Sequence, residues 1–309
     1  AGPAIDEIGD AFKGIQDGIC EFLVSTTGEQ YLEDLWEYDK GEGGGRTRVW
    51  ENAEPCAALE KAGVNFSQIS SATLPQAATE AHSLDPSAGF TATGVSLVIH
   101  PRNPHAPTIH MNVRYFDSGE TWWFGGGIDV TPYYPEEQDV ITLHRSLRDT
   151  CTRHGMPYQD YKEYCDRYFF LKHRNEARGV GGIFFESLNS TSMPEKSKQD
   201  LFAFVKDLGE SFVELYRPLL VPKLALPVSF DEREFQLLRR ARYVEFNLLF
   251  DRGTKFGIQS QGRTESILMS LPSVANWRYN WAPTPGSREE RVITFFLQPQ
   301  DWANMTVTK

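Results

Sequence analysis

A strict alternation of apolar and polar side chains marks the middle of the chain. The apolar set is Ile109, Met111, Val113 and Tyr115, and the polar set between them is His110, Asn112 and Arg114. Successive side chains of a strand point to opposite faces, so this pattern predicts a β-strand with one apolar and one polar face. A histidine, an amide and a guanidinium in one row suit anion binding better than contact with bulk solvent. We therefore expect this strand to carry the functional site.

A hairpin is predicted directly after this strand. Residues 117–119 read Asp-Ser-Gly, a turn signal, and residues 121–130 form a second apolar strand. Pairing of the two strands would place Trp122, Trp123 and Asp129 beside the polar row. The open face of the hairpin would then combine aromatic, acidic and basic groups.

Helices and strands are expected along the rest of the chain. Helical spacing or capping signals predict helices over residues 1–37, 136–154, 158–178, 197–216, 231–240 and 265–271, the last capped by Thr264. Strands are predicted over 47–69 with a break at 54–55, and over 91–100, 183–188 and 243–250. Ser96 and His100 share a side of the strand over 91–100. Residues 287–297 fit a helix or a strand, and the acidic start of this segment favours the helix.

The glycine-rich run over residues 40–48 is expected to lack regular structure. Two interpretations stay open for it, a solvated loop or a lid over a ligand, and the loop is favoured. No internal repeat and no linker divides the chain, and the strands and helices lack a regular βαβ rhythm. We therefore predict one α+β domain over residues 1–309, with a largely antiparallel sheet covered by helices.

Composition limits the classes of partner. The 309 residues carry a formal net charge of -11, which disfavours general binding to nucleic acid or to acidic membranes. An anionic ligand would need a local basic pocket. No apolar run is long enough to cross a bilayer. The cysteines Cys20, Cys56, Cys151 and Cys165 form no metal-ligand motif, so we expect reduced thiols and a cytoplasmic protein, or a mitochondrial one if a presequence has been removed.

Five long motifs, in order, cover much of the chain from about residue 90 to 285. They are HMNVRYF at 110–116, WWFGGGIDVTPYY at 122–134, HRNEARGVGGIFF at 173–185, YVEFNLLFDRGTKFG at 243–257 and GRTESILMSLP at 262–272. On these motifs the sequence resembles the oxygen-dependent coproporphyrinogen III oxidases of haem biosynthesis. The resemblance implies oxidative decarboxylation of two propionates of coproporphyrinogen III to vinyl groups, with O₂ as acceptor and no flavin or haem. It also implies a homodimer and a sheet sandwiched by helices.

The resemblance also implies roles for individual residues. Substrate contacts fall on Ser96, Asn112, Val113, Arg114, Gln261, Gly262 and Arg263. Propionates are carboxylates, which guanidinium groups bind bidentately, so Arg114, Arg252 and Arg263 are the expected anion-binding side chains. His110 falls at the proton donor's position and suits proton transfer because its charge changes near neutral pH.

Two carboxylates complete the predicted site. Asp251 and Asp129 are candidates for binding the pyrrole N–H groups and for helping to deprotonate the ring. For Asp251, a salt bridge with a nearby arginine is an equally supported alternative.

A metal site is the alternative to a cofactor-free reaction. His100, His110, His144 and His173 fall where some bacterial members of the family bind metal, but their spacing forms no compact ligand motif. We expect no metal, and His144 is expected to be a core residue. The lack of a dinucleotide fingerprint and of a cysteine cluster also favours direct transfer of electrons from the porphyrinogen to O₂.

Two rival functions remain open, a mononuclear metal oxygenase and a tetrapyrrole carrier without catalysis. The expected dimer interface lies within residues 243–278, where Val244, Phe246, Leu248 and Phe250 are predicted on one strand face. Burial within the chain itself is the competing explanation for these apolar side chains.

Overall fold

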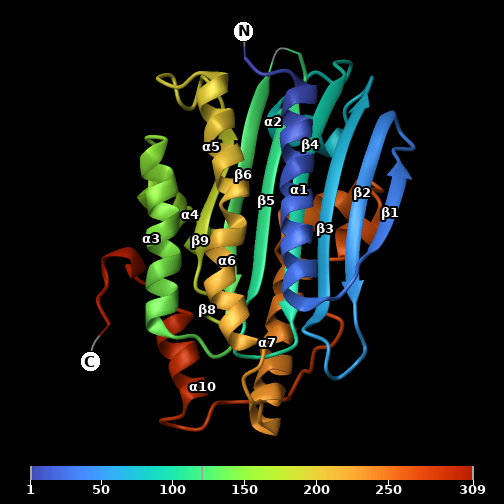
Figure 1. Cartoon of the computed structure of the whole chain (residues 1–309). Coiled ribbons are helices and arrows are strands. Elements are labelled where there is room, and N and C mark those ends of the chain that lie inside the picture. The colour runs from blue at the N-terminus through green and yellow to red at the C-terminus, as the bar shows by residue number, and fades with distance from the viewer. Residues whose placement is uncertain (1, 120, 308–309) are drawn as a thin grey trace.

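A seven-stranded, antiparallel sheet organises the computed structural model, which describes residues 2–119 and 121–307 (Figure 1). Its strand order is β1-β2-β3-β4-β5-β6-β9. The strands are β1 (Leu32–Glu37), β2 (Glu42–Glu51), β3 (Leu59–Ser71), β4 (Phe90–Pro101), β5 (Thr108–Asp117), β6 (Trp122–Thr131) and β9 (Gly182–Leu188). A separate two-stranded ribbon contains β7 (Phe170–Leu171) and β8 (Glu176–Ala177).

Helices connect and cover these strands. They are α1 (Ile5–Thr27), α2 (Gln76–His82), α3 (Glu137–Arg153), α4 (Tyr158–Tyr168), α5 (Lys198–Glu210), α6 (Phe212–Leu220), α7 (Phe230–Leu249), α8 (Arg252–Gln259), α9 (Thr264–Leu268) and α10 (Arg288–Arg291). Short turns of other helix types are η1 (Val221–Lys223), η2 (Val292–Phe296) and η3 (Trp302–Asn304). Within the described residues, no helix is both long enough and apolar enough to cross a membrane.

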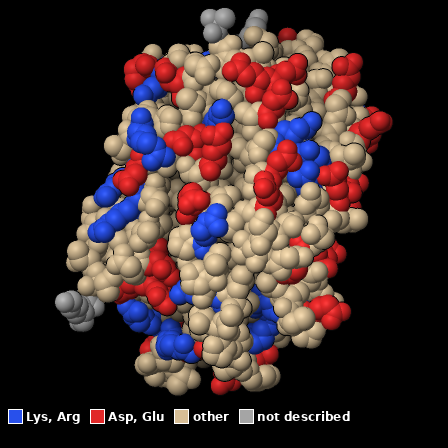
Figure 2. Space-filling view, in the orientation of Figure 1, with Lys and Arg blue, Asp and Glu red and all other residues tan. Residues whose placement is uncertain are grey.

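One face of the sheet supports the main hydrophobic core. Helix α1 packs on β3 and β4, α5 packs on β5 and β6, and α6 packs against α1, α3 and α5 (Figure 1). The apolar residues predicted on β5 point into this core, and each is at most 1% exposed. Acidic and basic side chains are interspersed over the outer surface of this helix layer (Figure 2).

The opposite face of the sheet is covered only in part. Helix α7 packs on it through Tyr243, whose ring meets His100 of β4 edge-on at a centroid distance of 5.2 Å. Phe246 of α7 and Phe184 of β9 belong to one apolar cluster on this face, in which the ring of Phe169 packs against both. Helices therefore flank both faces of an antiparallel sheet, and the predicted α+β fold is confirmed.

Most predicted elements are present. The strands of residues 47–69, 91–100 and 183–188 and the hairpin turning at 117–119 form as expected. Ser197 and Asp200 form the capping box predicted for the helix at 197, although this helix is divided into α5 and α6 at Ser211. Residues 288–296 are helical, as favoured.

Two predictions in the N-terminal region were wrong. The helix predicted over residues 1–37 ends at Thr27, because Gly28 adopts a left-handed φ of 73° and stops it. Residues 40–48 are not a loop, since most of them belong to β2. The glycines here permit close packing: a Cβ atom on Gly45 would collide with the ring of Trp36, which lies across it from β1.

Three predictions in the C-terminal half also need correction. The helix predicted over 158–178 ends at Tyr168 and is followed by the β7–β8 ribbon. Residues 243–249 are not a strand but the last turns of α7, which starts at a capping box formed by Ser229 and Glu232. Thr264 does not cap α9, because Arg263 occupies the N-cap position.

The first strand of the sheet, β1, is an edge strand with little cover. Leu32 is 72% exposed and Leu35 is 70% exposed, and β1 pairs only with β2. Edge strands present unpaired backbone groups along their free side. This strand is therefore the least protected part of the sheet.

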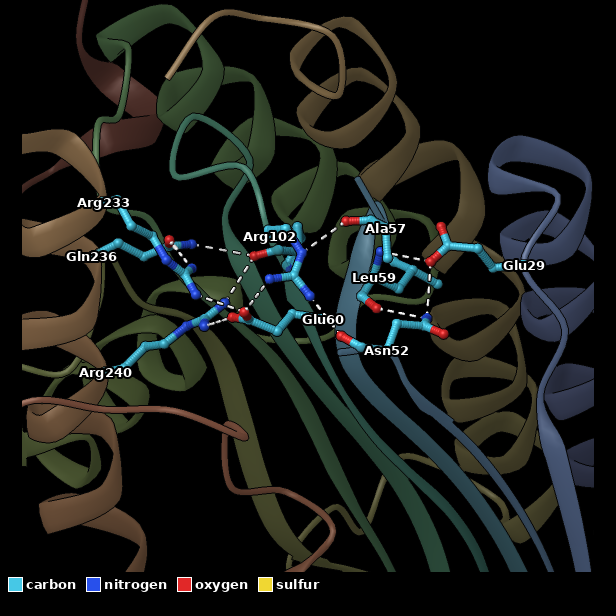
Figure 3. A network of polar contacts seen from close by, with 10 residues as sticks. Glu29, Asn52, Ala57, Leu59, Glu60, Arg102, Arg233, Gln236 and Arg240 are labelled. Carbon is cyan, nitrogen blue, oxygen red and sulfur yellow. Dashed lines mark hydrogen bonds and ion pairs between the residues drawn. The ribbon is translucent and has the colours of Figure 1, made fainter. Parts of the chain in front are cut away.

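A buried carboxylate joins α7 to the sheet. Glu60 of β3 is 4% exposed and forms ion pairs with Arg102, Arg233 and Arg240 (Figure 3). Arg240 also donates to the carbonyl oxygen of Pro101 at 2.9 Å. Three guanidinium groups around one buried carboxylate leave this junction with an excess of positive charge, so Glu60 is essential to its balance.

Replacement of Glu60 by glutamine should therefore destabilise the fold strongly. Loss of a buried charge partner costs about 3–5 kcal/mol of unfolding free energy, measurable by urea denaturation at neutral pH. Glu210→Gln is the control, because Glu210 pairs with Lys206 on the surface at 3.7 Å and is 56% exposed. The control should lose less than about 1 kcal/mol. Equal losses in the two variants would contradict the assigned role of Glu60.

Candidate active site

The uncovered part of the sheet presents a polar surface, which we call the open face. Directly opposed residues form one row across five strands, namely Asp34, Thr47, Asn65, Ser96 and Asn112. Opposed residues share a face of the sheet. Ser96 is solvent-exposed although it lies on the central strand β4. Exposure at the centre of a seven-stranded sheet leaves room for a ligand against the strands.

Arg114 defines one end of this surface. It lies over Gly125 of β6, where an added Cβ atom would come within 2.8 Å of its Nε. Its Nη2 donates to Oε1 of Glu186 on β9 at 3.2 Å. Arg252, at the start of α8, donates to Oε2 of the same carboxylate at 3.1 Å and to the hydroxyl of Tyr164 at 2.7 Å. Two guanidinium groups thus share one glutamate, which leaves a local excess of positive charge.

Arg263 defines the other end. It forms an ion pair with Asp34 of β1, and its Nη1 donates to Oγ of Ser266 at 2.9 Å. Its guanidinium group lies 5.5 Å from the ring centroid of Trp36. Asp34 lies on β1 and Arg114 on β5. These two strands are four interstrand spacings apart, or about 19 Å. The predicted arginines therefore lie at two ends of one face.

The predicted residues Gln261 and Gly262 precede Arg263 in an exposed turn. Gln261 has a φ of 55°, and its carbonyl oxygen accepts from Nζ of Lys40 at 3.3 Å. Val113 differs from the other predicted contacts. Its side chain is fully buried on the opposite face of the sheet, in the core, and does not reach the open face.

A buried chain of hydrogen bonds runs from the open face to α7. Nδ1 of His110 lies 2.6 Å from Oδ1 of Asp129, and Nη2 of Arg178 donates to Oδ2 of Asp129 at 2.8 Å. Arg178 also donates to Oδ1 of Asn247 at 2.7 Å, and Asn247 donates to Ser270 at 3.2 Å. Because Asp129 is 3% exposed and both of its oxygens bind side chains of this network, the carboxylate orients His110 and is shielded from the open face.

Arg178 sets the charge state of this hydrogen-bond network. Burial by itself raises the pKa of Asp129, but the charge of Arg178 and the hydrogen bond from His110 outweigh it, so the pKa lies below its ordinary value. The Arg178 guanidinium is surrounded by the rings of Phe169, Tyr243 and Phe246, with centroids at 4.2 to 4.9 Å. The ionised carboxylate of Asp129 therefore binds Nδ1 of His110 and orients the ring. Nε2 of His110 lies 3.5 Å from Nδ2 of Asn112.

Asp251 has a capping role that the sequence analysis did not predict. Its Oδ2 accepts from the backbone N–H and the hydroxyl of Thr254, at 2.8 and 2.9 Å, at the start of α8. Its Oδ1 accepts from the hydroxyl of Tyr168 at 2.9 Å. The alternative of a salt bridge between Asp251 and a nearby arginine is not what these contacts show.

The four histidines of the metal alternative do not converge. His100 is fully buried, with ring nitrogens 3.1 Å from the Thr108 hydroxyl and 2.8 Å from the Ser270 carbonyl. His144 is fully buried, with Nε2 2.9 Å from the carbonyl of Val180. Burial lowers the pKa of both rings to about 4, so both are neutral at pH 7.

His173 has a different partner: its Nε2 lies 2.6 Å from Oε1 of Glu245 on α7. Over residues 2–119 and 121–307, no group of three or more histidine, cysteine, aspartate or glutamate side chains is arranged to hold a metal. The proposed set of four histidines does not fit a shared site.

Sequence reasoning missed several residues of this region. Arg178 lies inside the motif at 173–185, but the helix predicted there hid its approach to Asp129. Glu186 follows the same motif on β9 with alternating spacing, which would have placed it on the face of Phe184. Asp34 and Trp36 lay inside a segment predicted as helix. Correct assignment of β1 would have placed both side chains on one strand face.

These groups suit a large, flat ligand with carboxylates at its rim. Guanidinium groups at the two ends can bind carboxylates, and the serine and amide between them can form hydrogen bonds. Oδ1 of Asn112 is buried without a hydrogen-bond partner among the described residues, so this acceptor is unsatisfied. His110 lies beside this acceptor, where it can transfer a proton to or from the ligand.

Comparison with known proteins gives two agreeing results. The family described as Coproporphyrinogen III oxidase matches residues 7–302. An oxygen-dependent coproporphyrinogen-III oxidase of Dictyostelium discoideum is 50% identical over 324 aligned positions, which cover 98% of this chain and 96% of that protein.

Asp129→Asn should destabilise the protein in a pH-dependent way. It leaves Arg178 buried without a charge partner, at a cost of about 3–5 kcal/mol near pH 7. The folded pKa of Asp129 is depressed, so its contribution is present above the unfolded pKa of about 3.9 and is lost as pH falls through the folded pKa. The difference between wild type and variant, measured by urea unfolding, should therefore shrink on acidification.

Asp17→Asn is the matched control for this measurement. Asp17 also contacts two arginines, Arg46 and Arg48, but it is 53% exposed. Its removal should cost less than about 1 kcal/mol. A loss for Asp129→Asn as small as this one, or one that does not change with pH, would contradict the assigned role of the buried pair.

Proposed function

This chain belongs to the coproporphyrinogen III oxidase family, and we propose that it converts coproporphyrinogen III to protoporphyrinogen IX. Two propionates lose CO₂ and become vinyl groups, and O₂ accepts the four electrons that are released. The nearly full-length match carries this proposal. The open face supports it, because it combines a broad polar floor with arginines at both ends. The match from residue 7 to 302 also supports a single domain.

The substrate is held by its carboxylates in this proposal. Arg114 and Arg252 bind propionates at the β9 end, and Arg263 binds one at the β1 end with the neighbouring turn of Gln261 and Gly262. Ser96 and Asn112 lie under the ring. Asn112 is assigned to a pyrrole N–H, because its Oδ1 has no hydrogen-bond partner among the described residues and a rotation of the side chain would turn it toward the ring.

Proton transfer is assigned to His110. Asp129 binds Nδ1 of His110, and Nε2 lies on the side of Asn112 and the open face. Asp251 is the second candidate group, because carboxylate oxygens that accept from Tyr168 and Thr254 retain lone pairs for a pyrrole N–H. Deprotonation of the pyrrole makes the ring electron-rich and favours electron transfer to O₂. We propose no cofactor for this step.

Aerobic incubation with coproporphyrinogen III tests the function. Mass spectrometry should show a product that has lost two CO₂ units. Tight binding without turnover would favour a tetrapyrrole carrier. In a parallel sample treated with a chelator and analysed for metals, activity should persist. Loss of activity that only iron or manganese restores would favour the metal oxygenase.

We further propose a homodimer with an interface in residues 243–278. The apolar strand face predicted over residues 243–250 does not form, because residues 243–249 are helical and Phe246 is buried within the chain's own core. Other apolar side chains of the segment remain uncovered, at 38% to 55% exposed, and they are Leu248, Leu249, Phe256, Ile258, Val274 and Trp277. Such a surface favours association with another subunit. Because Arg252 and Arg263 lie in the same segment, an interface there would support the site.

Sedimentation at micromolar concentration should show about twice the mass of 35.1 kDa. Ile258→Asp should weaken dimerisation and activity together, because Ile258 is 53% exposed inside the segment. Val221→Asp is the control, since Val221 is 43% exposed outside it. A fully active wild-type monomer would refute the dimer.

The compartment is also a proposal. We place the protein in the cytoplasm, with the mitochondrion as the alternative if a presequence is removed. The four free cysteines support a reducing compartment.

A further inference from the structure

The arginines proposed to bind substrate carboxylates already have carboxylate partners on the sheet. The two ends of the open face differ in their charge balance. At the β9 end, Arg114 and Arg252 share Glu186, so a net positive charge remains for an incoming anion. At the β1 end, Arg263 and Asp34 balance one to one. A carboxylate that binds Arg263 must therefore compete with Asp34.

The contacts of Arg263 locate this competition on one side of the guanidinium group. Its Nη1 is held by Ser266, and its Nη2 is the atom that Asp34 contacts. Asp34 is 43% exposed and Arg263 is 30% exposed, so solvent and ligand can reach the pair. A ligand carboxylate at Nη2 would occupy the same position as the Asp34 carboxylate, and two anions there repel each other.

Hydrogen bonds hold the aromatic ring beside the pair in place. Asp34 and Trp36 are two residues apart on β1 and so share a face. Nε1 of Trp36 donates to the hydroxyl of Thr47 at 3.0 Å, and this hydroxyl donates to Oδ1 of Asn65 at 2.6 Å. This network fixes the indole ring below Arg263. Asp34 can therefore be displaced from Arg263 while the ring continues to hold the guanidinium group in place.

We propose that Asp34 is an internal competitor for a substrate carboxylate, which holds Arg263 until a ligand carboxylate replaces it. This inference rests on the proposed function. A ligand without a carboxylate at the β1 end leaves the Asp34–Arg263 pair intact and gains nothing from Arg263. Asp34 therefore weakens the binding of ligands that carry a carboxylate at the end of the face opposite Arg114, and it does not change the binding of ligands that lack one there.

The test measures binding of coproporphyrin III, the stable oxidised form of the proposed substrate's ring, which carries the same four propionates. Fluorescence titration is done with wild type, Asp34→Asn, Arg263→Ala and the double variant. Asp34→Ser is a second variant at the same position, in case Asp34→Asn does not fold. Glu33→Gln is the matched control. Glu33 directly precedes Asp34 on β1, but it pairs with Arg48 on the opposite face of the sheet.

Asp34→Asn should bind coproporphyrin III about 2- to 5-fold more tightly than wild type, the scale of one exposed ion pair. Arg263→Ala should bind about 10- to 150-fold more weakly. In the Arg263→Ala background, the Asp34 substitution should have no effect, since the competition needs the guanidinium group. Coproporphyrin tetramethyl ester should bind Asp34→Asn and wild type equally, and Glu33→Gln should match wild type throughout.

Turnover gives a second readout that a purely structural role would not produce. For coproporphyrinogen III, Asp34→Asn should lower KM without changing kcat, because the competition weakens ground-state and transition-state binding equally. Unchanged or weaker binding by Asp34→Asn, or an equal effect in the Arg263→Ala background, would overturn the inference and leave the proposed function standing. If wild type neither binds coproporphyrin III nor converts coproporphyrinogen III, the proposed function fails and the inference fails with it.

Discussion

The buried ion pair between Asp129 and Arg178 connects the sheet, the helix α7 and the candidate site. Each side chain is 3% exposed, and neither charge could remain there without the other. Because both charges are satisfied, Asp129 can orient His110 and Arg178 can hold Asn247 of α7. The same pair that stabilises the packing of α7 thus fixes the group assigned to proton transfer. Stability and chemistry are joined at one contact.

The open face depends equally on residues without side chains. Arg114 can lie across β6 because Gly125 has no Cβ, and Trp36 can lie across β2 because of Gly45. In both cases a long side chain covers a neighbouring strand, and its functional end reaches a partner further along the face. The glycines at these two positions therefore determine where the Arg114 guanidinium group and the Trp36 ring are placed.

Sequence patterns predicted the centre of the sheet well and its surroundings less well. Period-two alternation identified β5 and the polar side chains of His110, Asn112 and Arg114, because one face of that strand packs in the core and the other is open. The same alternation failed at 243–249, where a helix buries polar as well as apolar side chains and so obscures its own period. Asn247 is 4% exposed there because it binds Arg178. Contacts of this kind between distant segments leave no mark in local sequence.

The position of Asp34 and Trp36 on the edge strand links ligand binding to local unfolding. Strand β1 is hydrogen-bonded along one side only and exposes Leu32 and Leu35, so it belongs to the least stable part of the sheet. Each time β1 separates from β2, Arg263 loses both the carboxylate and the ring that hold it. The apparent affinity at that end is therefore a population average over molecules with β1 paired and unpaired, which differ in the support that Trp36 gives Arg263 and in the competition from Asp34. Any partner or crystal contact that adds a strand to β1 would change the affinity of a site it never touches.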